Sequence, residues 1–253
     1  MFLKKTSIVL LLFLIIPLNI IAYSEYLIPG GENIGIELKS DGVIVVGTYK
    51  IDNNDPAKDA GIIKGDIITS IDDEKISSTS DLISKVNKSF DNEIKIGYIR
   101  NNIKSYTNLK LYKQNNINKT GLYIKDSIIG IGTLSFIDPT TKIFGALGHE
   151  IIEKSTGTIF DAKDGKIFES SVIGLIPSTN GEPGEKTARY YSEKINGNIF
   201  ENTNKGIFGN YTNQTPDKKL YKVAKNSEVK IGEATIRTVL SENVVSEFTI
   251  NIL

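Results

Sequence analysis

The sequence predicts a mainly β protein with a few helices, organised in two parts. Isoleucine and valine dominate many of its apolar segments, and residues branched at Cβ favour strands. Turn signals such as Asp41-Gly42 and Asn180-Gly181 separate these segments. Helical spacing of apolar residues is hard to find after residue 120. With 253 residues, 40% of them apolar, the chain is long enough for one large domain or two smaller ones.

The composition excludes several classes of function. The chain carries 30 basic and 30 acidic residues, and a net charge of zero gives no electrostatic footprint for nucleic acid. It has no cysteine, which excludes disulfides, thiolate metal sites and a cysteine nucleophile. A single histidine excludes metal sites built from several histidines. We therefore expect neither a metal nor another cofactor.

Residues 1–23 have the pattern of an export signal. A basic start precedes an unbroken apolar run over residues 8–16, which continues after Pro17. The apolar stretch is short for a membrane span, which typically needs ~20 residues. Two interpretations stay open, a cleaved signal peptide and a retained membrane anchor. Either one places the rest of the chain outside the cytoplasm.

Residues 27–113 predict a first domain of short strands and two helices. Alternating apolar residues predict strands at 34–38 and 43–46, joined by a hairpin turn at Asp41-Gly42. A short helix is expected at 55–61, where Asp55 caps it, Pro56 begins it and Gly61 ends it. Further along, we expect a strand at 67–71, a helix from Ser78 through Phe90, and strands at 93–99 and 106–112.

Three motifs in this domain resemble a PDZ domain of the bacterial, protease-associated type. They occupy residues 33–38, 55–61 and 65–68, in that order. The resemblance implies a peptide groove between the strand of Ile36 and the helix after Ser80. In such a groove an edge strand accepts a peptide strand, and backbone N–H groups bind a terminal carboxylate. The residues expected to line it are Ile34, Gly35, Ile36, Leu82 and Val86, whereas Leu38 and Ile83 are expected in the core.

A polar, asparagine-rich stretch at 114–120 predicts a linker to a second, β-rich domain at 121–253. Residues 128–136 and 143–149 predict a hairpin around a turn at 138–142. Later strands are expected at 157–161, 170–176, 219–224, 232–240 and 244–253, with a turn-rich loop at 180–186.

The only histidine, His149, ends the second strand of this hairpin, directly after Gly148. Two-barrel serine peptidases present their general base on such a hairpin, and their triad follows the chain order His, Asp, Ser. An imidazole changes charge near neutral pH, which suits a general base. A lone histidine can also be structural or merely exposed, and that alternative stays open. A zinc site of the His-Glu-x-x-His type is not expected, because the fifth position is Glu153.

Four segments of the second domain resemble the SpoIVB (stage IV sporulation protein B) peptidase family. They occupy residues 130–134, 144–149, 183–186 and 206–209. The resemblance implies a PDZ domain followed by a trypsin-like β-barrel peptidase domain with a His-Asp-Ser triad. It also implies secretion into the space between forespore and mother cell. There, proteolysis acts on membrane-associated regulators and triggers a late-sporulation transcription programme.

Only His149 carries over from the family's triad. The family's aspartate and its serine, within a Gly-Met-Ser-Gly-Ser-Pro block, match positions beyond Leu253, and Met1 is the only methionine here. We therefore expect a peptidase domain truncated at its C-terminus, an incomplete barrel and no catalytic activity in the chain as written. The alternative is a non-catalytic, exported regulator or scaffold whose PDZ domain binds a peptide or membrane partner.

Overall fold

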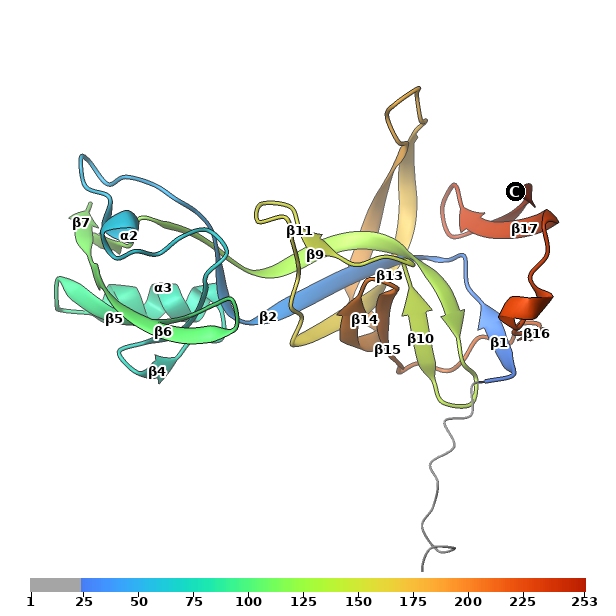
Figure 1. Ribbon diagram of the computed structural model, residues 1–253, viewed down its shortest axis with the longest axis horizontal. Helices are drawn as coiled ribbons and strands as arrows, with labels where there is room; N and C mark the ends of the chain where they lie inside the picture. Colours follow the sequence, from blue (N-terminus) through green and yellow to red (C-terminus); the bar gives the residue numbers. More distant parts are fainter. Residues whose placement is uncertain (1–23) are drawn as a thin grey trace, which may run out of the picture.

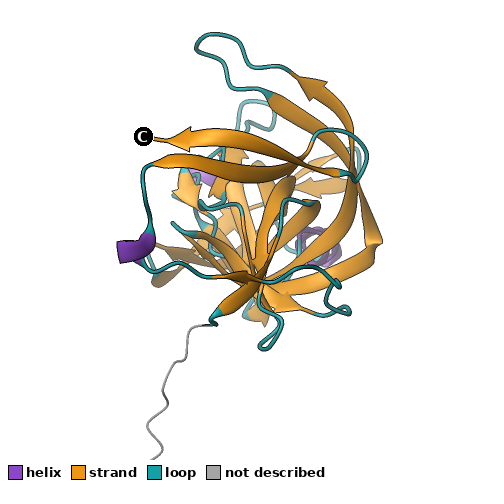
Figure 2. Ribbon diagram, turned by 90° about the vertical axis from the view of Figure 1, so that its right-hand side faces the viewer, coloured by secondary structure: helices purple, strands orange, loops and turns teal. Residues whose placement is uncertain are grey.

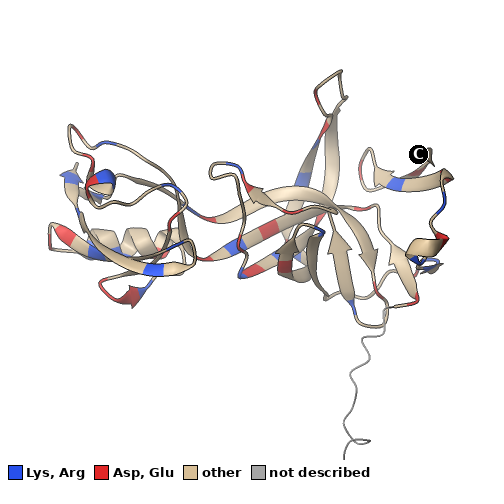
Figure 3. Ribbon diagram, viewed as in Figure 1, with Lys and Arg blue, Asp and Glu red and all other residues tan. Residues whose placement is uncertain are grey.

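The computed structural model describes residues 24–253, and the expected signal or anchor at 1–23 lies outside the described residues. Two units lie side by side, a small α/β unit and a larger barrel (Figure 1). Basic and acidic residues are interspersed along the ribbon of both units (Figure 3). In this part of the chain no helix has both the length and the apolar character needed to cross a membrane.

The strands and helices have the following bounds. The strands are β1 (Tyr26–Pro29), β2 (Asn33–Thr48), β3 (Ile67–Ile71), β4 (Glu74–Lys75), β5 (Glu93–Arg100), β6 (Ile103–Lys110), β7 (Tyr112–Gln114), β8 (Ile117–Lys119), β9 (Leu122–Ile137), β10 (Ile143–Ala146), β11 (Ile152–Glu153), β12 (Thr158–Ile159), β13 (Asp164–Ile176), β14 (Glu185–Thr203), β15 (Gly206–Tyr211), β16 (Tyr221–Lys222), β17 (Gly232–Val239) and β18 (Val245–Ile252). The helices are α2 (Pro56–Asp59), α3 (Thr79–Lys88) and a 3₁₀ helix at Asn226–Glu228.

The larger unit is a closed antiparallel barrel. Around the ring, β2 pairs with β9, β9 with β10, and β10 with β15. From there β15 pairs with β14, β14 with β13, and β13 returns to β2. Numbered along the chain, the strands therefore follow the order first, second, third, sixth, fifth, fourth. Figure 2 views the molecule from the end that the barrel occupies. The core enclosed by these strands includes Ile36, Phe144 and Ile167.

The small unit is inserted between the first two barrel strands. β2 and β9 are both 16 residues long, and they leave the barrel together. Their far halves pair at Ile44–Thr48 and Leu122–Lys125, where β3, β5 and β6 extend the sheet. A separate core fills this unit and contains Val45, Leu82 and Leu122. The two units thus share two continuous strands and have two distinct cores.

This insertion corrects the expected domain boundaries of 27–113 and 121–253. Residues 33–39 belong to the barrel, and residues 122–125 belong to the small unit. The expected hairpin at Asp41-Gly42 is also wrong, since β2 runs through this dipeptide without reversing. Gly42 has a φ of 129° and lies where the register of β2 against β9 shifts between Lys39 and Ile44. The glycine therefore permits a bulge, which re-aims a strand without ending it.

The expected linker at 114–120 is instead part of the small unit. β7 and β8 form a hairpin, and the Nδ2 atom of Asn118 donates to the carbonyl oxygens of Val86 (2.8 Å) and Ser89 (3.1 Å). Asn118 thereby satisfies carbonyl groups at the end of α3, which the helix itself leaves free. α3 begins as expected, with the Ser78 hydroxyl accepting from the Asp81 N–H, but it ends at Lys88 and leaves Phe90 exposed.

The longest strand, β14, was not expected from the sequence. Its first residues were assigned to a turn-rich loop at 180–186. β13 and β14 extend beyond the barrel as a projecting hairpin (Figure 1), so their far ends are largely exposed and carry no apolar alternation. The final strands β17 and β18 pair only with each other among the described residues. The expected mainly β fold with few helices is confirmed.

Candidate functional site

His149 follows the third barrel strand on a strained turn. Leu147 has a φ of 73°, and the N–H of Gly148 donates to the carbonyl of Ala146 at 3.0 Å, which closes a three-residue turn. Positive φ at a non-glycine residue is unfavourable, and such strain persists only where the surroundings hold it. Here the N–H of Leu147 also donates to the carbonyl of Thr133 on β9 at 3.0 Å. The turn is therefore tied to a neighbouring strand.

Two glycines make room for this turn. A Cβ atom at Gly206, the first residue of β15, would overlap the carbonyl oxygen of Ala146. A Cβ atom at Gly132 on β9 would overlap the side chain of Leu147. Both glycines lie in segments that resemble the SpoIVB family, so part of that resemblance reflects the packing around the histidine turn.

His149 is exposed and lies beside an open cleft of about 390 Å³. The cleft is lined by Asn33, Ile131, Gly132, Thr133, Leu147, His149, Glu185 and Lys186. Burial lowers the pKa of Lys186, whose ammonium group donates to the hydroxyl of Thr238 on β17 at 2.7 Å. This hydrogen bond ties Lys186, on one wall of the cleft, to β17 near the end of that strand.

The imidazole of His149 makes one hydrogen bond within the described residues. Its Nδ1 atom lies 2.9 Å from the carbonyl oxygen of Glu150. Since a carbonyl oxygen can only accept, Nδ1 must carry the proton in this contact. Nε2 of the neutral ring is then the unprotonated nitrogen, which is the form that a general base requires.

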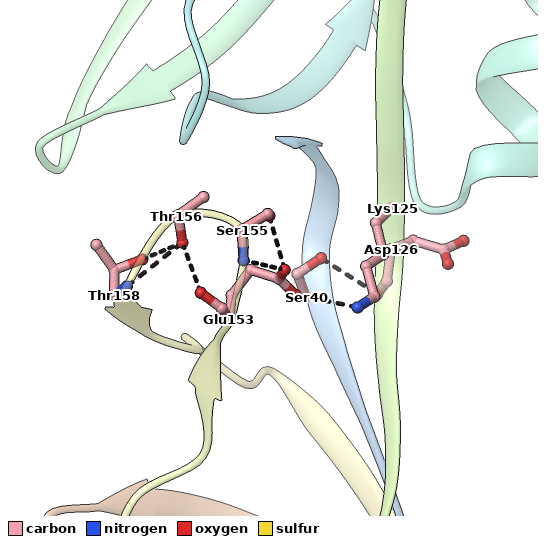
Figure 4. A network of polar contacts seen from close by, with 7 residues as sticks. All are labelled: Ser40, Lys125, Asp126, Glu153, Ser155, Thr156 and Thr158. Carbon is pink, nitrogen blue, oxygen red and sulfur yellow. Dashed lines mark hydrogen bonds and ion pairs between the residues drawn. The ribbon is translucent and has the colours of Figure 1, made fainter. Parts of the chain in front are cut away.

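The segment after His149 is held against the barrel by polar contacts. Asn202 on β14 binds both the N–H and the carbonyl of Ile151, at 2.9 and 3.0 Å. Further on, the buried Glu153 pairs with Lys125 at 3.1 Å and accepts from the N–H and hydroxyl of Ser155 (Figure 4). Burial alone would raise the pKa of Glu153, but these hydrogen bonds and the ion pair outweigh it and lower the pKa.

The prediction that the strand of Ile34, Gly35 and Ile36 lines the peptide groove is wrong. Ile34, Gly35 and Ile36 lie in the barrel, where β2 is paired on one side with β13 and on the other with β9. A strand paired on both sides has no free edge for a peptide. Leu38 is buried, as expected, but in the core of the barrel and not in that of the PDZ-like domain.

A different strand provides the groove of the small unit. A cavity of about 220 Å³ lies between α3 and the first residues of β9. Leu82 and Val86, two of the expected residues, are buried along it, and Ile83, which was expected in the core, is half exposed there. Leu122 and Ile124 of β9 take the place expected for Ile34 and Ile36. Within residues 24–253 no strand pairs with the outer edge of β9 at this point.

Contacts at both ends hold α3 in place, one with β9 and one with β8. At the start of the helix, the N–H of Thr79 donates to the carboxylate of Asp126 at 2.7 Å. At its end, Asn118 binds the last carbonyl groups, and the adjacent Lys119 lines the same cavity. The groove is therefore held open, and it has a basic side chain at one end.

Comparison with known families assigns the chain to a family. The SpoIVB peptidase S55 model matches residues 116–253, which is more than half of the chain. The chain belongs to the SpoIVB peptidase S55 family. A PDZ domain model matches residues 33–111, so the small unit is a PDZ domain, a fold that binds peptides.

The solved structures that are similar to part of this S55 family member include a PDZ domain. The PDZ domain of the SdrC-like protein from Listeria monocytogenes is 26% identical, over 34% of this chain and 90% of that one, with a TM-score of 0.30. No curated protein matches the chain. The described residues contain no group of three or more histidine, cysteine, aspartate or glutamate side chains that could hold a metal ion.

Sequence reasoning missed several residues of both sites in this SpoIVB family member. Pairing of the barrel strands brings Asn202 and Thr133 within hydrogen-bond distance of the histidine segment, and no local pattern reveals that pairing. The strand that lines the groove does carry a local signal in the sequence. Gly121 followed by alternating Leu122 and Ile124 has the glycine-then-strand pattern that was assigned to Gly35 and its neighbours.

Proposed function

We propose that this chain provides the histidine-bearing barrel of a SpoIVB-type serine endopeptidase that acts in proteolytic signalling during spore formation. The observation that carries the proposal is the place of His149. It follows the third strand of a six-stranded barrel closed in the trypsin-like order, and it lies exposed beside a cleft. In such peptidases the histidine takes the proton of a serine hydroxyl as that oxygen attacks the scissile carbonyl, and it then protonates the leaving amine.

The nucleophile and the aspartate of the triad would have to come from other residues. The sequence holds no Gly-x-Ser-Gly segment after His149, and such a turn exposes the hydroxyl and supplies N–H groups for the oxyanion. The 253-residue polypeptide by itself is therefore proposed to be inactive. Export is part of the same proposal, with residues 1–23 as a cleaved signal peptide or a retained membrane anchor, and so is action between the forespore and mother-cell membranes. The family and the apolar N-terminal run support this part.

The PDZ groove is proposed to hold a peptide of a target or of a membrane-associated regulator. A peptide strand would add to the free edge of β9, with apolar side chains against Leu82, Ile83 and Ile124. The ammonium group of Lys119 would favour a carboxylate at its end of the groove.

A direct test expresses this chain joined to the polypeptide that is encoded by the DNA following codon 253. If that DNA encodes a Gly-Met-Ser-Gly-Ser-Pro block, the joined protein should cleave peptides, and His149→Ala should lower its kcat/KM by at least about a thousandfold. Lys154→Ala is the matched control, because Lys154 is exposed five residues away and should leave the rate unchanged. Activity in the 253-residue chain alone, or activity of the joined protein that survives His149→Ala, would contradict the proposal.

A second function has its own support in the PDZ domain. Its groove is complete within the described residues and needs no catalytic group. A DNA sequence with a stop and no trace of the serine block would favour a non-catalytic exported regulator or scaffold. Peptide binding would then be the whole activity of the chain.

A further inference from the structure

The acceptor of the His149 hydrogen bond belongs to a peptide group that is itself held from its other side. The carbonyl of Glu150 and the N–H of Ile151 are parts of one trans peptide unit, and they point in opposite directions. The carbonyl faces Nδ1 of His149 at 2.9 Å, and the N–H donates to Oδ1 of Asn202 at 2.9 Å. The orientation of this one peptide plane therefore determines what Nδ1 encounters.

Asn202 contacts that plane through Oδ1, and its Nδ2 atom binds two neighbouring carbonyl groups. While Oδ1 accepts from the N–H of Ile151, Nδ2 donates to the carbonyl of Ile151 at 3.0 Å and to that of Phe160 at 2.9 Å. Phe160 is buried in the barrel core, so the third contact anchors the amide to a rigid part of the fold. An amide is suited to this place because it offers both an acceptor and two donors.

We propose that Asn202 is a positioning residue for His149. By fixing the peptide group between Glu150 and Ile151, it turns the Glu150 carbonyl toward Nδ1, keeps the proton of the neutral ring there and leaves Nε2 able to accept one. The backbone carbonyl thus orients the imidazole from the nitrogen that the triad aspartate contacts in serine peptidases. This inference rests on the proposed function for its catalytic meaning, but its geometry concerns this chain alone.

The single histidine makes the proposal measurable without any activity. In the full chain labelled with ¹⁵N at histidine, all imidazole signals arise from His149. At alkaline pH, where the ring is neutral, the ¹⁵N shifts should show the Nδ1–H form as the major tautomer. A major Nε2–H form would overturn the proposal, even if the joined peptidase described above were active. Conversely, an inactive joined protein with a major Nδ1–H form would count only against the proposed function.

Substitution separates the role of Asn202 from that of the barrel as a whole. Asn202→Ala should lower the ratio of Nδ1–H to Nε2–H about two- to tenfold, the range expected for one neutral hydrogen bond. Asn198→Ala is the control, because Asn198 is exposed on the same strand and should leave the ratio unchanged. An unchanged ratio in Asn202→Ala, or an equal change in Asn198→Ala, would overturn the proposal.

A second measurement covers the case in which Asn202→Ala fails to fold. In the unmodified chain the amide of Ile151 should exchange slowly with solvent, since its partner is the side chain of Asn202. Exchange as fast as that of an exposed amide would show that the peptide plane is not held, and it would overturn the proposal.

Discussion

Glu153 shows how a single buried carboxylate links the two units of the molecule. It lies on β11, just after the histidine turn, and its partner Lys125 lies on β9 where that strand passes from the PDZ domain into the barrel. Four residues after His149, the chain is thus tied to the strand that forms the peptide groove. Only the glutamate of this ion pair is buried: the side chain of Glu153 is 5% exposed and that of Lys125 is 41% exposed.

This carboxylate should make stability depend on pH in a defined way. The pKa of Glu153 is lowered in the folded chain, so its carboxylate stabilises the fold at pH values above the ordinary glutamate pKa. This stabilisation is lost as the pH falls through the pKa that Glu153 has in the folded chain. Glu153→Gln should lower the free energy of unfolding by about 1–3 kcal/mol at neutral pH. Urea unfolding at several pH values should show this difference narrowing in acid.

The control for this prediction is Glu201→Gln, since Glu201 is exposed and should shift stability little at any pH. A difference between Glu153→Gln and the unmodified chain that stays constant from neutral to acidic pH would contradict the account.

At the residue scale, the sequence indicated His149 and two groove residues of α3, but not their partners. Leu82 and Val86 could be found because helical spacing is local. Asn202 contacts a peptide 51 residues away, and only the closure of the barrel brings the two together. Side-chain contacts to distant backbone have no periodic signature in a sequence.

At the scale of elements, β9 serves both sites. Its first residues line the peptide groove beside α3, and Ile131, Gly132 and Thr133 line the cleft beside His149. The sequence predicted the barrel half of this strand and the start of α3. It did not predict that the strand begins at Leu122. The polar segment before this residue has the composition of a linker, although it forms the β7–β8 hairpin.

The groove can be tested with a pair of isoleucines. Ile83 lines the groove and is 50% exposed, whereas Ile63 lies elsewhere in the PDZ domain and is 53% exposed. Ile83→Glu should weaken binding of peptides selected from a random C-terminal library by about tenfold or more, because it places a charge on an apolar contact. Ile63→Glu should leave the Kd unchanged in fluorescence polarisation. Equal effects of the two variants would place the groove elsewhere.

At the scale of the whole molecule, the order of segments along the chain does not reveal that the PDZ domain is inserted between two barrel strands. A PDZ domain preceding a β domain was visible in the sequence, and both exist. The first barrel strand, however, lies before the inserted PDZ domain and is continuous with one of its strands. Sequence patterns locate strands but not their partners across an insertion. The Asp41-Gly42 pair is typical of a hairpin turn, although β2 continues through it.

Residues from both sides of the PDZ domain close the histidine-bearing barrel, and a shortened chain can test this directly. Lys39 and Ser127 are directly paired, so a two-residue Asn-Gly turn can replace residues 40–126. The measurement is thermal unfolding of this shortened chain, compared with a fragment of residues 121–253 that lacks β2. We predict one cooperative transition for the shortened chain and aggregation, without such a transition, for the fragment, whose β9 and β13 edges are unpaired. A cooperatively melting, monomeric fragment beside an unfolded shortened chain would contradict the claim.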